Sequence, residues 1–217
     1  MTRVRVDLFI SLDGFATTTD QTPENPFGDD WGRLTAAYAG TRTFRERVFH
    51  DSSGAGTTGV DDDYVVAYFE GIGAEIMGAG MFGLHDHGDE PDWQGWWGDE
   101  PPFHTPVFVL THVPRPSLEL GDTVFHFLTA TPQEALEKAI AVAGGGDIRI
   151  GGGPTTVRSF LAAGLVDQLH VSIVPILLGR GIRLWDDLRG LEDGYTVTTV
   201  GAPSGVTHLT FSRDAHA

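Results

Sequence analysis

The chain has 217 residues and a formal net charge of −16, from 14 basic and 30 acidic side chains. This balance argues against a nucleic-acid-binding protein, because such proteins neutralise phosphates with lysine and arginine. The chain has no cysteine, which excludes disulfides and thiolate metal sites, and no apolar run near the roughly 20 residues of a membrane helix. We therefore expect a cytoplasmic globular protein that binds neither nucleic acid nor a membrane.

The first half of the chain alternates between strand and helix patterns. Val4 to Leu12 begins with alternating β-branched residues, which predicts a strand, and Asp13-Gly14 ends it as a turn. Acidic residues follow Val60, and negative charge in the first turn favours a helix there. The predicted elements are strand 4–12, a helix over 31–48 interrupted at Gly40, helix 60–73, strand 74–77, a helical turn after it, and strand 106–110. We expect residues 84–105 to form an irregular, acidic and aromatic insertion.

The second half contains the clearest helix signal. Thr131 and Glu134 have the spacing of a capping box, Pro132 suits the first helical position, and Gly144 marks the end. The predicted elements are strand 123–128, helix 132–143, strand 147–150, helix 154–164, strand 168–175, and a terminal antiparallel pair at 195–200 and 206–212. This order predicts one α/β domain over residues 1–217, with a mostly parallel central sheet, helices on both faces and an antiparallel C-terminal edge.

The stretch IGGGPTT at 150–156 places three glycines between a strand and a helix. One interpretation is a tight corner, since glycine allows positive φ and close packing of a helix on a strand. The other is an anion site, because a helix N-terminus at the carboxyl end of a strand offers unpaired N–H groups. The stretch has neither the Walker ending nor the Gly-x-Gly-x-x-Gly spacing, so by itself it leaves both interpretations open.

Two other strand ends favour a ligand. EIMGAGMFG at 75–83 is a second strand that runs into glycines, and VFVLTH at 107–112 is an apolar strand that ends in a hydroxyl and an imidazole. Ligands of α/β sheets lie at the carboxyl ends of the strands. One extended, phosphate-bearing ligand explains three such ends better than three unrelated corners do.

These stretches, together with SLDGF at 11–15 and the whole of 148–181, carry a family resemblance. The sequence resembles the dihydrofolate-reductase-like fold, in the branch similar to the C-terminal reductase domain of bifunctional riboflavin-biosynthesis enzymes. The resemblance extends over about residues 3–213. It implies NADPH binding, hydride transfer to a small heterocyclic or ribosyl-imine substrate, and a homodimer.

The resemblance also implies a role for each matching residue. The expected cofactor residues are Ser11, Gly14 and Phe15 beside the nicotinamide, Gly78, Gly80 and Met81 at the adenosine phosphate side, Thr111 and His112 at the 2′-phosphate, and Gly151, Gly152, Gly153, Thr155 and Thr156 at the pyrophosphate. The expected substrate-pocket residues are Leu178, Gly179 and Gly181, with Asp30 and Trp97 as further candidates.

One position departs from the family pattern. The family usually has Gly-Arg after the second strand, and the arginine contacts the 2′-phosphate, but this chain has Gly78-Ala79. One charge-assisted contact is worth roughly 1.5–3 kcal/mol, or about 10- to 100-fold in affinity. Arg115 and His112 are the candidates to replace it. NADPH is therefore the expected cofactor and NADH the alternative.

Reduction of a C=N bond needs a proton as well as a hydride. Asp13 is the first candidate for the proton donor, although Asp-Gly is also a strong turn former. Asp29 and Asp30, just before Trp31, are the second candidates, and helix N-capping is the more ordinary role for them.

Histidines and tryptophans are the remaining candidates. His85, His87 and His104 lie near Asp86, Asp89 and Asp92, but the pattern is too weak for a zinc site, and we expect surface histidines and no metal. Among Trp93, Trp96 and Trp97, we expect at least one ring to face the substrate. His170 shares a polar strand face with Gln168 and Ser172, which we expect at solvent or at a subunit interface.

Three functions remain open at this point. The first is an NADPH-dependent reductase of a small molecule, such as a ribosylamino-pyrimidine of the 5-amino-6-(5-phosphoribosylamino)uracil type. The second is a pterin or dihydrofolate-type reductase, which requires a carboxylate on the first helix, so that Asp30 would have to point inward. The third is a non-catalytic protein that binds a nucleotide or a partner. Cofactor titration separates the first two from the third.

Overall fold

The computed structural model describes residues 2–17, 22, 25, 27–85 and 87–213. The strands are β1 (Val4–Ser11), β2 (Phe15–Thr17), β3 (Ile72–Gly78), β4 (Pro106–Leu110), β5 (Leu118–Leu120), β6 (Thr123–Leu128), β7 (Asp147–Gly152), β8 (Gln168–Val174), β9 (Ile182–Arg183), β10 (Thr196–Gly201) and β11 (Thr207–Ser212). The helices are α1 (Trp31–Ala39), α2 (Arg42–Val48), α3 (Val60–Phe69), α4 (Ala79–Phe82), α5 (Pro132–Val142), α6 (Pro154–Ala162) and the 3₁₀ helix η1 (Leu191–Gly194).

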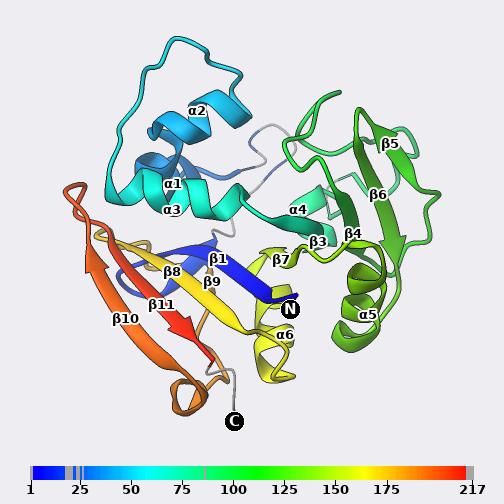
Figure 1. The fold of residues 1–217 in the computed structure, drawn as a ribbon. Coiled ribbons are helices and arrows are strands. Elements are labelled where there is room, and N and C mark those ends of the chain that lie inside the picture. Colours follow the sequence, from blue (N-terminus) through cyan, green and yellow to red (C-terminus); the bar gives the residue numbers. More distant parts are fainter. Residues whose placement is uncertain (1, 18–21, 23–24, 26, 86, 214–217) are drawn as a thin grey trace.

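Nine strands form the main sheet, in the order β10-β11-β8-β1-β7-β3-β4-β6-β5 (Figure 1). The pairings from β8 across to β6 are parallel, and β10–β11, β11–β8 and β5–β6 are antiparallel. The predicted α/β fold with a mostly parallel sheet and an antiparallel C-terminal edge is therefore confirmed. Strand β5 and the small β2–β9 sheet were not predicted, because strands of two or three residues are too short to show an alternating pattern.

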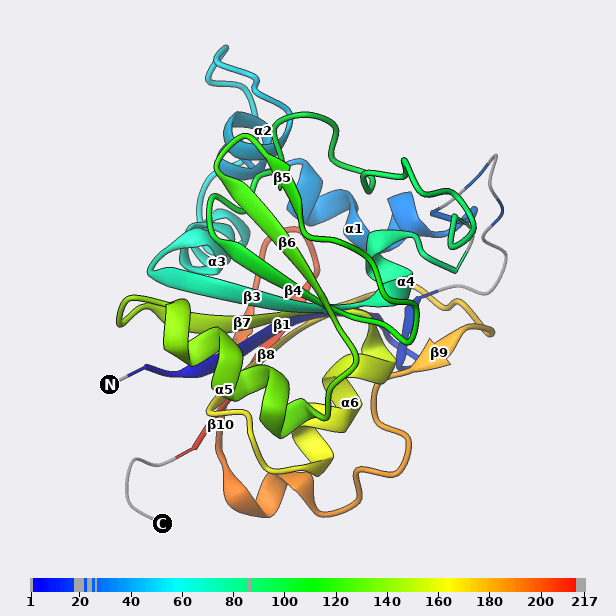
Figure 2. The same cartoon turned by 90° about the vertical axis from the view of Figure 1, so that its right-hand side faces the viewer.

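One face of the sheet is apolar and packs against α5 and α6 (Figure 2). Alternate residues of the strands point to this side, as the two-residue period of a strand requires. The largest core cluster includes Val4, Val6, Ile148 and Ile150 from the sheet and Leu136 and Phe160 from the two helices. Helix α5 begins with the predicted capping box, in which the Thr131 side chain accepts from the Glu134 N–H and Glu134 accepts from the Thr131 N–H.

The opposite face of the sheet carries charged residues and is covered by α1 and α3 (Figure 1). Arg5 donates to the carbonyls of Glu70 and Ala67, and Arg149 donates to the carbonyl of Tyr68. These carbonyls belong to the C-terminal end of α3, where a helix leaves its last C=O groups unpaired and favours positive charge. Arginines from the sheet thus hold one end of α3, whose only buried apolar residue is Val65.

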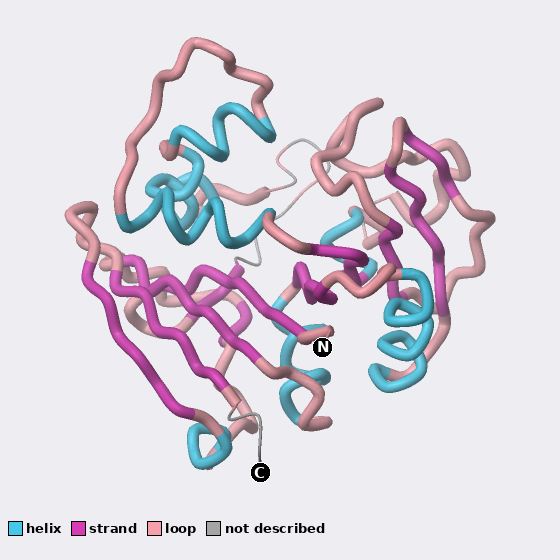
Figure 3. The backbone as a smooth tube through the Cα atoms, in the orientation of Figure 1, coloured by secondary structure: helices cyan, strands magenta, loops and turns pink. Residues whose placement is uncertain are grey.

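The chain between α4 and β4 has no helix or strand among its described residues, as predicted for the insertion (Figure 3). It is nevertheless packed, because Phe103 and Leu84 join a second core cluster with Phe82, Val107 and Phe125. The helix predicted over 31–48 is two helices, since Gly40 ends α1 and the Thr41 side chain caps α2 by accepting from the Phe44 N–H. Among the described residues, no helix is both long and apolar enough to cross a membrane.

Candidate functional site

Four neighbouring strands of the sheet end at the same edge. Strands β1, β7, β3 and β4 are adjacent and parallel, so their carboxyl ends lie side by side. The register pairs Met77 with Gly152 and Gly78 with Leu110. The structure therefore brings together the three strand ends whose residues favour a ligand, at 78–81, 111–112 and 151–156.

The turns after β3 and β7 are in contact with each other. A Cβ added at Gly78 would lie 2.3 Å from Thr156 Oγ1, so any other residue there requires the Thr156 hydroxyl or the start of α6 to move. Helix α6 begins at Pro154 after Gly153, with the N–H groups of Thr155 and Thr156 in its first turn. The first N–H groups of a helix have no partner within the helix and favour an anion. An anion at this position would meet backbone N–H groups of α6.

The side chain of Met81 lies over Gly151 and Gly152. Its Sδ atom is 3.4 Å from the position of a Cβ on Gly152, and its Cε atom is 3.5 Å from the position of a Cβ on Gly151. Methionine is unbranched and flexible, so its thioether can move aside more easily than a branched residue. A ligand that contacts Gly151 and Gly152 on this side must displace Met81.

At the end of β4, the candidate side chains differ in whether they are exposed and free to contact a ligand. His112 is exposed, whereas Thr111 is buried and its hydroxyl accepts from the Val113 N–H. Arg115, expected as one replacement for the missing arginine at position 79, donates instead to the carbonyls of Glu90, Pro91 and Trp93. The 84–105 insertion thus holds the NH2 group of Arg115, whereas the NH1 group is buried with no hydrogen-bond partner among the described residues. Arg115 and His112 both stay predictions for the 2′-phosphate.

Asp13 ties the end of β1 to a distant loop. Its carboxylate accepts from Ser11 Oγ at 2.6 Å, from the Gly179 N–H at 2.7 Å and from the Leu178 N–H at 3.1 Å. Burial works to raise the pKa of Asp13, but these hydrogen bonds outweigh it and hold the pKa at about 2. Near neutral pH the group is therefore a carboxylate with no proton to give, which argues against the donor role and for the turn role.

Ser11 and Phe15, expected beside a nicotinamide, are both buried. The Ser11 hydroxyl is used within the turn, since it donates to Asp13 and accepts from the Phe15 N–H. The Phe15 ring lies against the Arg183 guanidinium, 4.5 Å from its central carbon. The turn therefore offers a ligand its backbone, including Gly14 with a φ of +88°, and the exposed side chain of Leu12 rather than those of Ser11 and Phe15.

Asp30 lies close to the loop that Asp13 holds. It occupies the N-cap position of α1, but its side chain makes no capping hydrogen bond, contrary to the ordinary role expected for it. Its carboxylate instead accepts from Arg33 NH1 at 2.5 Å and lies 3.9 Å from Arg180 NH2. Asp29 accepts from the Asn25 side chain. The structure thus joins Asp13, Asp30 and the expected substrate residues Leu178, Gly179 and Gly181 around one loop.

The tryptophans mainly serve packing. Trp97 is half-buried and packs on the rings of Phe103 and Phe125 in the second core cluster, and its place in the substrate pocket stays a prediction. Trp93 donates from its indole N–H to the Phe82 carbonyl. Trp96 packs toward another part of the chain: its ring centroid lies 5.6 Å from that of Phe27, on the segment just before α1.

The histidines of the insertion pair with acidic residues or pack on neighbouring residues among the described part of the chain. Among the described residues, no group of three or more histidines or acidic residues is arranged to hold a metal ion, and Asp86 lies outside those residues. His85 packs against Gly80, and His87 and His104 form pairs with Glu90 and Asp122. His170 is 7% exposed and lies under α3, so the expectation of solvent or a subunit interface was wrong.

A buried ion pair beneath the glycine turn was not predicted. Glu75 on β3 and Arg149 on β7 are paired residues in the register and are 0% and 2% exposed. Arg149 Nε donates to Glu75 Oε2 at 2.9 Å, and the guanidinium lies over the Tyr68 ring at 3.8 Å. Burial works to lower the pKa of Arg149, but the charge on Glu75 raises it above its ordinary value. An Arg and a Glu 74 positions apart give no signal in sequence.

The sequence profile of the family described as the RibD C-terminal domain matches residues 2–193. The chain belongs to the RibD C-terminal domain family. No curated protein matches it in sequence.

Solved structures share the fold of this RibD C-terminal domain protein. A candidate riboflavin biosynthesis protein from Shewanella sp. PV-4 is 21% identical, with a TM-score of 0.63 over 98% of this chain and 99% of that one. Dihydrofolate reductase from Enterococcus faecalis, complexed with NADP(H), is 11% identical, with a TM-score of 0.50 over 98% and 96%. The diaminohydroxyphosphoribosylaminopyrimidine deaminase/5-amino-6-(5-phosphoribosylamino)uracil reductase from Thermotoga maritima is 10% identical, with a TM-score of 0.52, and the match covers 98% of this chain and 56% of that one.

Proposed function

We propose that this protein is an NAD(P)H-dependent reductase of a small heterocyclic or ribosylamino-pyrimidine-like substrate. The observation that carries the proposal is the contact between Gly78 and Thr156, which puts two glycine turns and a helix N-terminus at one sheet edge. Membership of the RibD C-terminal domain family supports the same reaction class. The substrate type comes from the solved structures with this fold, which include a uracil-derivative reductase and a dihydrofolate reductase.

The residues at this edge suit a dinucleotide. Gly151, Gly152, Gly153, Thr155 and Thr156 would hold the pyrophosphate through backbone N–H groups and hydroxyls. Gly78, Gly80 and Met81, together with Thr111 and His112, would line the adenosine side. The dinucleotide supplies the hydride when bound. The chain orients it and, through Met81 and the turn at 11–15, limits the access of water.

On the substrate side, Asp13 acts as a positioning residue in this proposal. Its carboxylate holds the Leu178–Gly179 backbone beside the end of β1, where a reacting ring would lie. Asp30 and Arg180 close the other side of the same loop. Because the pKa of Asp13 is about 2, the proton for C=N reduction comes from another group or from water.

The residue at position 79 does not favour NADPH over NADH. Ala79 offers no charge to a 2′-phosphate, and Arg115 is engaged elsewhere, so we propose that the protein accepts both NADPH and NADH. The homodimeric state and the cytoplasmic location stay predictions from the sequence. Sedimentation of the purified protein tests the first.

Cofactor titration tests the proposal. A ligand at 100 times its Kd raises the free energy of unfolding by roughly 2.7 kcal/mol, so NADPH or NADH should raise the melting temperature clearly. Gly153→Ala separates binding from stability, because a Cβ at this position meets no atom within 4 Å in the free protein. The variant should keep its stability and lose dinucleotide affinity, since the Cβ occupies the space of the phosphate. Gly194→Ala, equally uncrowded and far along the chain, is the control.

The two alternatives give different results. A non-catalytic protein that binds another nucleotide or a partner would show no thermal shift with NADPH or NADH. Oxidation of NADPH with dihydrofolate would establish the pterin reductase. The structure does not favour this alternative, because the Asp30 carboxylate that it requires is bound by Arg33. Absence of any shift with millimolar NADPH and NADH would overturn the reductase proposal.

A further inference from the structure

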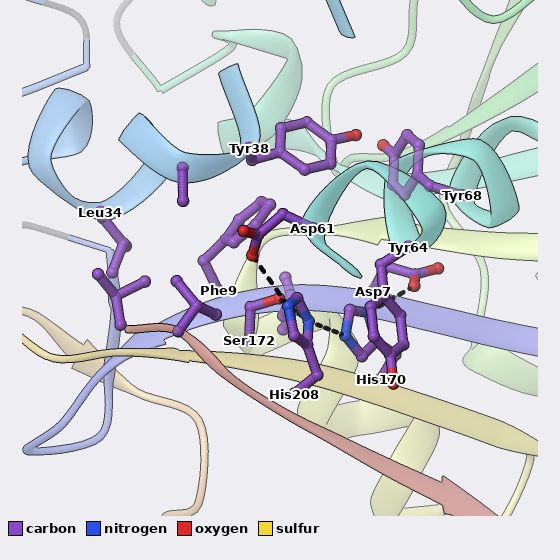
Figure 4. Close-up of a pocket in the computed structure, with 14 residues that line it drawn as sticks. Asp7, Phe9, Leu34, Tyr38, Asp61, Tyr64, Tyr68, His170, Ser172 and His208 are labelled. Atoms are coloured by element: carbon purple, nitrogen blue, oxygen red, sulfur yellow. Dashed lines mark hydrogen bonds and ion pairs between the residues drawn. The ribbon is translucent and has the colours of Figure 1, made fainter. Parts of the chain in front are cut away.

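Two histidines and two aspartates form a buried row between the sheet and α3 (Figure 4). Asp7 Oδ1 lies 3.0 Å from His170 Nδ1, His170 Nε2 lies 3.0 Å from His208 Nδ1, and His208 Nε2 lies 3.0 Å from Asp61 Oδ1. The four residues come from β1, β8, β11 and α3. His170 is 7% and His208 is 3% exposed.

If all three contacts are hydrogen bonds, a count of hydrogens gives this row one proton more than two neutral histidines carry. Each of the three contacts needs one hydrogen between its two heavy atoms. Two ionised aspartates bring none, and two neutral imidazoles bring one each. Ser172 Oγ, 3.3 Å from His208 Nδ1, can donate to that nitrogen, but it leaves His170 Nε2 facing a second lone pair. The third hydrogen therefore makes one of the two rings an imidazolium.

We propose that Asp7, His170, His208 and Asp61 form a buried binding site for one excess proton, and that this proton fastens α3 to the sheet near neutral pH. The shared positive charge lies between two carboxylates, which favour it. The site is independent of the proposed reductase activity.

The groups that contact the row are neutral, and one further charge acts on it, because the Glu75 carboxylate on β3 lies close enough to Asp7 for the two to repel each other. The Tyr64 ring of α3 stacks on both imidazoles, with centroids 4.2 Å from His170 and 4.1 Å from His208, and an aromatic face favours a cation. Ser204 donates to Asp61 Oδ1 from the β10–β11 loop. Tyr38 of α1 and Tyr68 of α3 line the same cavity, and burial raises the pKa of both phenols, so they stay protonated.

Neither a catalytic triad nor a metal centre suits the geometry of the row. Ser172, His208 and Asp61 have the order of a nucleophile, base and orienting acid, but Ser172 is 3% exposed and the adjoining cavity has about 20 Å³, room for a water molecule and no substrate. A metal ion is also unsupported, because no group of three ligating side chains among the described residues is arranged to hold one.

The sign of the pH dependence follows from the proton count. Above the ordinary histidine pKa of about 6.5, the unfolded chain leaves both rings neutral while the folded row holds one proton, so stability falls as pH rises. Below that value, the unfolded chain charges both rings while the folded row accepts only one charge, so stability falls as pH drops. Burial lowers the pKa of His208, and a positive charge on His170 lowers it further, while the hydrogen bond to Asp61 raises it. The net lowering disfavours a second proton on the folded row at acidic pH.

Asp61→Asn is the decisive variant. The asparagine amide can donate its own hydrogen to His208 Nε2. All three hydrogen bonds of the row can then form with two neutral rings and no excess proton. Wild-type protein should lose up to tenfold in its folding equilibrium constant per pH unit above about 6.5 through this site, and Asp61→Asn should not. Asp122→Asn removes the exposed pair with His104 and serves as the matched control.

Nitrogen-15 NMR of the histidines gives a direct readout in the wild type, whatever the stability of the variant. At pH 7.5 the His170–His208 pair should show one imidazolium, and α3 amides should exchange faster as that signal disappears at higher pH. Two neutral rings at pH 7.5 in folded wild-type protein would overturn the proposal. So would an unchanged alkaline slope in Asp61→Asn.

Discussion

Glu75 Oε1 occupies the place where a side chain on Gly151 would begin, because a Cβ added there would lie 2.2 Å from this oxygen. The other carboxylate oxygen, Oε2, is held by Arg149. Oε1 is buried without a hydrogen-bond partner among the described residues. A buried ion pair thus supports the glycine turn from below and makes glycine necessary at position 151.

Glu75→Gln should destabilise the protein strongly. The amide leaves Arg149 buried without its counter-charge, and breaking a buried pair from one side costs about 3–5 kcal/mol. Urea unfolding measures the effect, with Glu119→Gln on the exposed side of β5 as the control. A loss below about 1 kcal/mol, the range of surface pairs, would contradict the view that this pair is desolvated.

Gly78→Ala should impair both stability and cofactor binding. The added methyl group meets Thr156 Oγ1 at 2.3 Å, so the Thr156 hydroxyl must leave its place at the start of α6 or the helix must shift. Thermal melting and NADPH titration of the same sample check the two effects. Gly153→Ala should lose binding alone, so equal melting temperatures for these two variants would refute the stated contact.

Asp13→Asn should lower activity without changing the shape of its pH profile between pH 5 and 9. The folded-state pKa of about 2 lies below the usual Asp value, so the stabilising contribution is present above about pH 3.9 and is lost as pH falls through about 2. Asn can accept the same hydrogen bonds only through its single oxygen, so the 178–179 loop should loosen and KM should rise. Disappearance of an acidic limb from the kcat/KM profile would show instead that Asp13 donates the proton.

Ala79→Arg should shift cofactor preference toward NADPH. A new charge-assisted contact with the 2′-phosphate is worth roughly 1.5–3 kcal/mol, or about 10- to 100-fold in Kd. Affinity for NADH should stay within a few-fold, because NADH has no phosphate there. Ala79→Gln, of similar length but neutral, controls for bulk, and calorimetric titration of both dinucleotides measures the ratio.

The sequence was sufficient to predict features that depend on neighbours along the chain. The capping box of Thr131 and Glu134 needs only three residues of spacing, and the structure confirms it. The glycine-bounded strand ends also met as predicted, because parallel strands place their carboxyl ends at one edge.

Features that depend on distant partners could not be predicted. The role of Asp13 is set by Leu178 and Gly179, which lie 165 and 166 positions away. The alternation around His170 identified a polar face correctly, but not that Tyr64 of α3 would cover it. Trp97 shows the same limit, since the aromatic residues around it did not indicate which side of the insertion faces the core.

The two faces of this sheet are held by different forces, with aliphatic contacts toward α5 and α6 and hydrogen-bonded charges toward α3. Hydrophobic attraction weakens on cooling, whereas contacts between charged groups and carbonyls do not depend on that term. Cooling should therefore weaken the contacts toward α5 and α6 more than the hydrogen bonds from Arg5 and Arg149 to α3.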